Sequence, residues 1–120
     1  MYFKDVLGQE KLKMLLMQSV REGTVPHAQL FFGPRGSANL ALALAFAQYV
    51  ACANKQQYDA CGTCSSCVKH LKFVHPDLHF VFPVATTSNV KTKPVSKNFL
   101  SEWRSLLDEN PYFSLFDWLK

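Results

Sequence analysis

Four cysteines lie close together near the middle of the chain, and their spacing is typical of metal ligands. They form the pattern C-x8-C-x2-C-x2-C and are Cys52, Cys61, Cys64 and Cys67. A CxxC turn places two thiolates on one side of an ion, and zinc takes four such ligands in a tetrahedron at about 2.3 Å. Because four cysteines leave no open coordination position, the pattern favours a structural zinc over a catalytic one.

Two other uses of the cysteines compete with zinc. Four cysteines can form two disulfides in three ways, and a CxxC pair can be a redox centre. The sequence has no charged and apolar leader and no apolar run long enough to span a bilayer, so we expect a cytoplasmic protein without a membrane partner. Thiols stay reduced in that compartment, which disfavours disulfides, and four thiols close together disfavour a redox pair. Zinc is therefore the favoured interpretation.

A segment that precedes the cysteines, GPRGSANL, is similar to a phosphate-binding loop. Working loops of this kind read G-x-x-x-x-G-K-[ST] between a strand and a helix. Gly33 supplies the first glycine, whereas Ala38, Asn39 and Leu40 stand where the second glycine, the lysine and the hydroxyl residue should be. Ala38 carries a Cβ where the backbone must approach phosphate closely. Asn39 has no positive charge, and Leu40 has no oxygen for Mg²⁺.

Two uses remain open for this degenerate loop. The first is weak anion binding by the free N–H groups at the helix N-terminus. The second, which we favour, is a turn in which Gly33 and Gly36 only bring the chain back into the helix, because donors without charge or metal bind phosphate weakly. Arg35 could replace part of the missing charge but not the metal ligand. We therefore expect no hydrolysis and no role for ATP or Mg²⁺.

Composition and size are those of one globular domain at most. The 120 residues are 48% apolar and 18% charged, which excludes a disordered chain. The net charge of +4 suits an acidic partner such as nucleic acid, but ordinary surface lysines explain it equally well. Aromatic residues crowd positions 112–119, and from this we expect an N-terminal fragment of a larger domain.

Hydrophobic periodicity predicts the elements that position these groups. We expect helices over residues 5–22, 38–53, 67–73 and about 97–110, strands over 28–32 and 78–84, and a polar loop over 85–97. Ser96 is the expected cap of the last helix. On that helix one face carries Phe99, Leu100, Trp103, Leu106 and Leu107. On the first helix the core face is expected to carry Leu12, Leu15, Leu16 and Val20, and the solvent face Lys11, Lys13, Gln18 and Arg21.

Taken in order, these motifs resemble bacterial DNA polymerase III clamp-loader subunits. The similarity covers residues 5–84 and rests on DVLGQE, PHAQLFFGPRG, the alanine-rich helix, the cysteine pattern and HPDLHFV. It implies an α/β fold, the N-terminal part of a P-loop AAA+ domain in which helices flank a parallel sheet. Residues 1–120 would be part of that domain, and residues 52–67 a zinc module inserted after the P-loop helix. The insertion at that place is the specific part of the resemblance.

Within this family, gamma/tau subunits keep an intact loop and hydrolyse ATP, whereas delta-prime subunits have a degenerate one. The loop of this chain is similar to that of delta-prime. The resemblance implies a non-hydrolysing subunit that helps to load the sliding clamp onto primed DNA during replication. Its partners would be the gamma/tau and delta subunits, the clamp and, through the complex, DNA. Val6, Leu7 and Gly8 match the segment that lines the adenine pocket of active relatives.

Two other functions remain as hypotheses. One is an ATP-binding subunit of gamma/tau type, or an unorthodox ATPase that uses Arg35 and Asn39. The other is a zinc-dependent module that contacts nucleic acid through the lysines around the cysteines, Lys55, Lys69 and Lys72. We expect these lysines to be a solvated rim, and His70 and His75 to be surface or packing residues instead of metal ligands.

Overall fold

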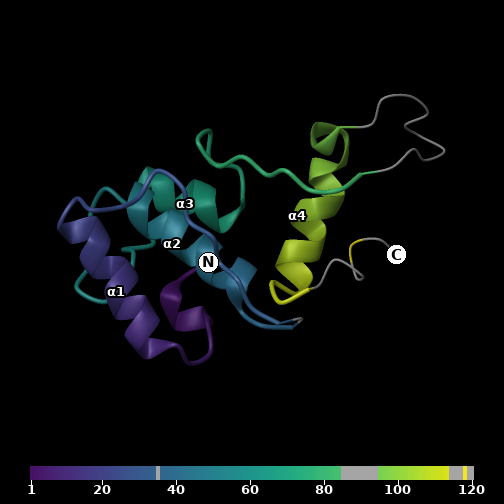
Figure 1. Ribbon diagram of the computed structural model, residues 1–120. Coiled ribbons are helices and arrows are strands. Elements are labelled where there is room, and N and C mark those ends of the chain that lie inside the picture. Colours follow the sequence, from purple (N-terminus) through teal and green to yellow (C-terminus); the bar gives the residue numbers. More distant parts are fainter. Residues whose placement is uncertain (35, 85–94, 114–117, 119–120) are drawn as a thin grey trace.

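The structure is a computed structural model that describes residues 1–34, 36–84, 95–113 and 118 (Figure 1). Over these residues it contains four α-helices and two short 3-10 helices but no β-strand. In chain order they are η1 (Phe3–Asp5), α1 (Glu10–Arg21), α2 (Asn39–Ala51), α3 (Ser65–Leu71), η2 (Ser96–Phe99) and α4 (Leu100–Glu109). None of these helices is long and apolar enough to cross a membrane.

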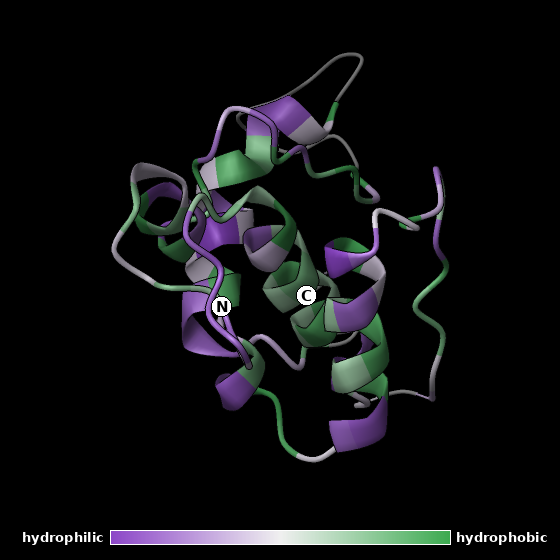
Figure 2. Cartoon of the chain, turned by 90° about the vertical axis from the view of Figure 1, so that its left-hand side faces the viewer, coloured by the Kyte–Doolittle hydropathy of each residue, from purple (hydrophilic) through white to green (hydrophobic). Residues whose placement is uncertain are grey.

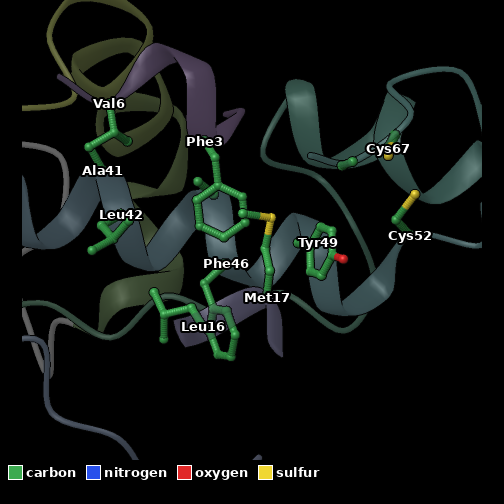
Figure 3. Packing of buried hydrophobic residues seen from close by; sticks show 12 residues of the cluster. Phe3, Val6, Leu16, Met17, Ala41, Leu42, Phe46, Tyr49, Cys52 and Cys67 are labelled. Atoms are coloured by element: carbon green, nitrogen blue, oxygen red, sulfur yellow. The ribbon is translucent and has the colours of Figure 1, made fainter. Parts of the chain in front are cut away.

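Helix α2 is the centre of the fold. It contacts α1, α3 and η1, and it is apolar around most of its circumference, as expected for a buried helix. One side of α2 packs against η1 and α1 in a first hydrophobic cluster that includes Phe3, Leu16 and Tyr49 (Figure 3). Leu44 belongs instead to a second cluster, whose other buried members are Phe73, Phe82, Trp103 and Leu107.

The first helix differs from its prediction in length and orientation. It begins at Glu10, because Gly8 and Gln9 have φ angles of 71° and 60°, which a continuous helix does not accommodate. Lys13, expected in solvent, is buried and its Nζ donates to the Val6 carbonyl at 2.5 Å. Leu12 and Leu15, expected in the core, are exposed. The face of α1 that packs against α2 is therefore not the predicted one, and Leu16 lies at the centre of the observed face.

The two predicted strands do not form in the described part of the chain. Segments 28–32 and 78–84 have no regular secondary structure, and Leu30, Phe32 and Val81 are 86%, 89% and 94% exposed. A strand requires a neighbour to pair its N–H and C=O groups, and no described segment provides one. Within residues 28–32 Phe31 packs against Phe46, whereas the other four residues are exposed, so this segment is not the buried strand that the sequence predicts. The parallel sheet of the predicted α/β fold is thus absent from these residues.

Helix α4 carries the apolar face that the sequence predicts, with Trp103 and Leu107 buried. Trp103 stacks on Phe82 with ring centroids 4.2 Å apart. Ser96 is not the cap of this helix: α4 begins at Leu100, and Ser96 Oγ instead donates to the Phe82 carbonyl and accepts from its N–H, both at 3.0 Å. Most of the predicted 85–97 loop, and most of the aromatic 112–119 segment, lie outside the described residues.

Polar and apolar residues are interspersed along the helices, as Figure 2 shows by colour. Residues 74–84 run in an extended path from α3 towards the start of α4 (Figure 1). This path and the second cluster connect α4 to α2, through Leu44, and to the end of α3, through Phe73.

Candidate metal centre and phosphate loop

The four cysteines meet at the junction of α2 and α3. Cys52 is the C-cap of α2, Cys64 is the N-cap of α3, Cys67 lies in the first turn of α3, and Cys61 lies in the loop between the helices. All four Sγ atoms lie within 4.8 Å of one another. Among them, Cys52 and Cys61 are 3.5 Å apart, and the Cys61–Cys67 and Cys52–Cys64 pairs are 4.0 Å apart.

These separations fit a single metal ion and not disulfides. A tetrahedral ion at about 2.3 Å from each sulfur requires sulfur atoms roughly 3.8 Å apart. A disulfide requires about 2.05 Å, and all four cysteines are free. The four predicted ligands are therefore brought together in an arrangement that can hold a metal ion.

Backbone N–H groups point at the sulfur atoms and stabilise their ionised form. Cys61 Sγ accepts from Thr63 at 3.5 Å and from Cys64 at 3.4 Å. Cys64 Sγ accepts in the same way from Cys67 at 3.4 Å. Gly62 makes this turn possible, because its φ angle is 79° and a Cβ there would collide with the ring of Tyr2.

The thiols respond differently to these surroundings. The Thr63 and Cys64 N–H groups lower the pKa of Cys61 to about 6. Hydrogen bonds, the largest from the Ala53 N–H, also lower the pKa of Cys64. Burial raises the pKa of Cys67 to about 12. These surroundings favour the thiolate of Cys61 and the thiol of Cys67, so a cation that binds all four sulfur atoms would have to displace the Cys67 proton.

The cysteine segment is part of the main core. Cys52 and Cys67 are 2% and 0% exposed and share the first cluster with Phe3 and Tyr49, as Figure 3 shows. The Asp59 carboxylate accepts from the backbone N–H groups of Phe3 and Lys4. Sequence analysis missed Asp59, because no local pattern links it to residues 56 positions earlier in the chain.

The basic residues around the cysteines have separate environments. His70 is buried and stacks on His75 with ring centroids 4.5 Å apart, so the prediction that they are packing residues holds for His70. Neither histidine joins the four-cysteine group. Lys55 Nζ donates to the Cys52 carbonyl at 2.7 Å, whereas Lys69 and Lys72 are exposed. Lys69 and Lys72 are therefore solvated, as predicted. Lys55 instead supports the backbone of Cys52, one of the four candidate metal ligands.

The predicted phosphate loop is a turn whose polar groups bond to one another. The Ser37 N–H donates to the Pro34 carbonyl at 3.0 Å, and α2 begins at Asn39. Asn39 Oδ1 accepts from the Leu40 N–H at 3.0 Å, and Asn39 Nδ2 donates to the Phe31 carbonyl at 3.5 Å. An N–H group that could face an anion at the helix N-terminus is therefore already bonded within the loop.

The local structure of the loop explains why glycine occupies positions 33 and 36. A Cβ on Gly33 would lie 2.5 Å from Ser37 Oγ, and Gly36 has a φ angle of 82°. Both observations show that the turn itself requires these two glycines. Arg35 lies outside the described residues, and Ala38 is the N-cap of α2 without a capping side-chain bond.

A pocket of about 430 Å³ lies beside this turn, between α1, α2 and residues 29–32. The described residues that line it are apolar or neutral and are Gln9, Leu12, Leu16, Gln29, Leu30, Phe31, Phe32, Ser37, Ala38, Asn39 and Leu42. Val6, Leu7 and Gly8, which the resemblance assigns to an adenine pocket, do not line it. They line a different hollow of about 650 Å³ beside η1 and α1.

In this chain a glycine-containing turn enters the buried helix α2, and four cysteines that could hold a metal ion follow at the end of that helix. Residues 8–114 match the family model described as "DNA polymerase III, delta subunit", and the chain belongs to this family. Membership confirms the predicted resemblance at the level of DNA polymerase III clamp-loader proteins.

Curated relatives share about half of this chain. It is 38% identical over 66 residues to DNA polymerase III subunit gamma/tau of Mycobacterium tuberculosis. The aligned segment covers 55% of this chain and 11% of that protein. The chain is 35% identical over 65 residues to subunit tau of Bacillus subtilis, covering 54% and 12%. Protein STICHEL-like 3 of Arabidopsis thaliana is 37% identical over 68 residues, covering 57% and 6%. The chain thus spans about a tenth of these relatives or less, and no solved structure matches it.

Proposed function

We propose that this chain belongs to a non-hydrolysing clamp-loader subunit of delta-prime type, which helps to load the sliding clamp onto primed DNA. The observation that carries the proposal is the bonding of Asn39. Its side chain accepts from the Leu40 N–H and donates to the Phe31 carbonyl, so it occupies the helix terminus that a nucleotide phosphate would need.

The missing chemistry at the loop supports the same conclusion. Asn39 supplies no charge for a triphosphate, and Leu40 supplies no oxygen for Mg²⁺. The subunit would then contribute a rigid surface to the loader, while gamma/tau partners bind and hydrolyse ATP. The delta subunit, the clamp and primed DNA complete the expected assembly, which would work in the cytoplasm.

Structural zinc is the second part of the proposal. The sulfur separations suit a tetrahedral ion, and four cysteines leave no position for a substrate. Zinc would connect the end of α2 to the start of α3 through Cys52 and Cys64, and it would not take part in a reaction.

Reconstitution of clamp loading tests the proposed role. The full subunit that contains this chain is mixed with gamma/tau, delta and clamp from the same source, and loading onto primed DNA is measured. We expect loading to require the subunit, and Asn39→Ala to leave the ATPase rate of the assembly unchanged. Magnesium-dependent ATP hydrolysis by the isolated subunit would contradict the proposal, as would loading that proceeds equally well without it.

The names of the relatives favour a second candidate, an ATP-binding subunit of gamma/tau type. This candidate predicts micromolar, Mg²⁺-dependent ATP binding by the full subunit. Equilibrium titration with a fluorescent ATP analogue separates the two, because the delta-prime proposal expects no such binding.

A further inference from the structure

A third pocket lies between the segment that follows α3 on one side and η2 and the first half of α4 on the other, away from the cysteines and the degenerate loop. Its volume is about 400 Å³. Four of its lining residues carry basic groups, Lys97, Arg104, His75 and His79, and Leu78 and Leu100 are part of its apolar wall. Of the described residues that line this pocket, none is an Asp or a Glu.

The guanidinium of Arg104 is held in a defined position. Arg104 Nε donates to the Phe73 carbonyl at 3.0 Å, and this bond leaves the two Nη groups for other acceptors. In the described part of the chain the one ion pair joins Lys13 to Glu10, so no described carboxylate lies within 4.0 Å of the Arg104 guanidinium or the Lys97 ammonium. A fixed, half-buried cation without a counter-charge is a natural anion ligand.

Phe73, which holds Arg104, has an unusual backbone conformation. Its φ angle is 58°, a value that bulky residues rarely adopt. The Phe73 N–H donates to the His70 carbonyl and the Val74 N–H to the Lys69 carbonyl, both at 3.0 Å. This is the Schellman arrangement that ends many helices, usually with glycine at the position of Phe73.

Burial of the Phe73 ring in the second cluster keeps this strained conformation, which aims the carbonyl at Arg104. The helix end therefore accounts for the conformation of Phe73, and through the Phe73 carbonyl it fixes the position of the Arg104 guanidinium.

His75 forms part of the wall, and both of its ring nitrogens have partners within the chain. Its Nδ1 accepts from the Asp77 N–H at 3.1 Å, and its Nε2 lies 3.4 Å from Ser66 Oγ. Positive charge in the pocket therefore comes from Arg104 and Lys97, with the exposed His79 as a further donor.

We propose that this pocket binds a phosphate group. A planar guanidinium presents paired donors to two oxygens of a tetrahedral anion, and a flexible ammonium can reach a third. The phosphate could be free or part of a nucleic-acid backbone, since both present the same oxygens. This inference does not rest on the proposed clamp-loader role, because it uses neither the degenerate loop nor the cysteines.

Binding measurements with the zinc-loaded 120-residue chain test the pocket. Inorganic phosphate is titrated by calorimetry, and a fluorescent single-stranded oligonucleotide by anisotropy. Lys97→Gln is compared with Lys11→Gln, which removes the same charge from the exposed face of α1. We expect Lys97→Gln to weaken binding about tenfold, because it removes a charged hydrogen bond, and Lys11→Gln to leave the affinity unchanged. Arg104→Lys is a second variant, which keeps the charge and removes the paired donors.

The two probes distinguish the source of the phosphate. Lys97-dependent binding of inorganic phosphate supports a site for a free anion, and Lys97-dependent binding of the oligonucleotide alone supports a site for nucleic-acid backbone. Absence of binding by both probes overturns the proposal. Equal effects of Lys97→Gln and Lys11→Gln also overturn it, because they would show attraction to net charge without a defined site.

Discussion

The carboxylate of Asp59 accepts a hydrogen bond from the backbone N–H of Phe3 at 3.1 Å, and its second oxygen accepts from Lys4 at the same distance. These N–H groups begin the 3-10 helix η1, where helical turns leave donors without partners. Asp59 therefore caps η1 from the cysteine segment. The cap attaches the loop between Cys52 and Cys61 to the N-terminal turn, so the order of one region depends on the other.

Removing this cap should destabilise the whole chain. We expect Asp59→Ala to lower the free energy of unfolding by about 1–2 kcal/mol, as loss of a helix cap does elsewhere. Urea denaturation of the zinc-loaded protein measures the change, and faster hydrogen exchange at Phe3 and Lys4 locates it. Asp108→Ala, at an exposed position of α4, is the matched control. Unchanged exchange at Phe3 would show that Asp59 is not the cap.

Zinc should be required for a folded core. The freshly reduced protein is expected to contain one equivalent of zinc by metal analysis, and Cys67→Ser to lose most of it. Structural zinc in small peptides supplies on the order of 10 kcal/mol, and Cys67 is buried in the first cluster, so chelation should disrupt α2 as well as the loop. The control is Thr63→Ala, which changes a neighbouring residue and keeps all four cysteines. Full near-UV circular dichroism after chelation would contradict a structural role for the ion.

Restoring the three missing loop residues should restore nucleotide binding. The combined variant Ala38→Gly, Asn39→Lys and Leu40→Thr regains close approach, charge and a Mg²⁺ ligand, and frees the Leu40 N–H from Asn39. We expect it to bind fluorescent ATP at least about tenfold more tightly than the natural sequence, and only with Mg²⁺. Asn39→Gln is the control. If the natural sequence binds with micromolar affinity that Asn39→Lys does not improve, the loop is not degenerate.

Local features of the structure were predictable, because they depend on residues close together in the sequence. The gathering of the cysteines follows from two CxxC steps and from Cys52 at the end of a helix. The apolar length of α2 and the buried stripe of α4 follow from composition and period. At the loop, the missing lysine and hydroxyl were evident from a comparison of residues 33–40 with a known pattern.

Non-local features were not predictable in the same way. The apolar run at residues 28–32, bounded by Pro26 and Gly33, is typical of a buried parallel strand, but pairing depends on a neighbour that the described residues do not supply. The burial of Lys13 depends on the Val6 carbonyl, which accepts a hydrogen bond from Lys13 because the chain turns at Gly8. The Asp59 cap and the carbonyl of Phe73 likewise act on residues far along the chain, and no short pattern marks them.

Burial of His70 should make the chain sensitive to mild acid. His70 is 5% exposed, and burial, with a smaller contribution from His75, lowers its pKa from 6.5 to about 4. In the unfolded chain the ring binds a proton below about pH 6.5, whereas in the folded chain it stays neutral until about pH 4. Its contribution to stability is therefore complete above pH 6.5 and is lost as the pH falls towards 4.

We expect this loss to reach about 2–3 kcal/mol, measured as the difference in unfolding free energy between the natural chain and His70→Leu. Acid also releases metal from cysteines, but it does so in both proteins, so the difference isolates the histidine. The difference should stay constant above pH 6.5 and shift in favour of the leucine variant between pH 6.5 and 4. A constant difference over the whole range would show that His70 accepts a proton without unfolding.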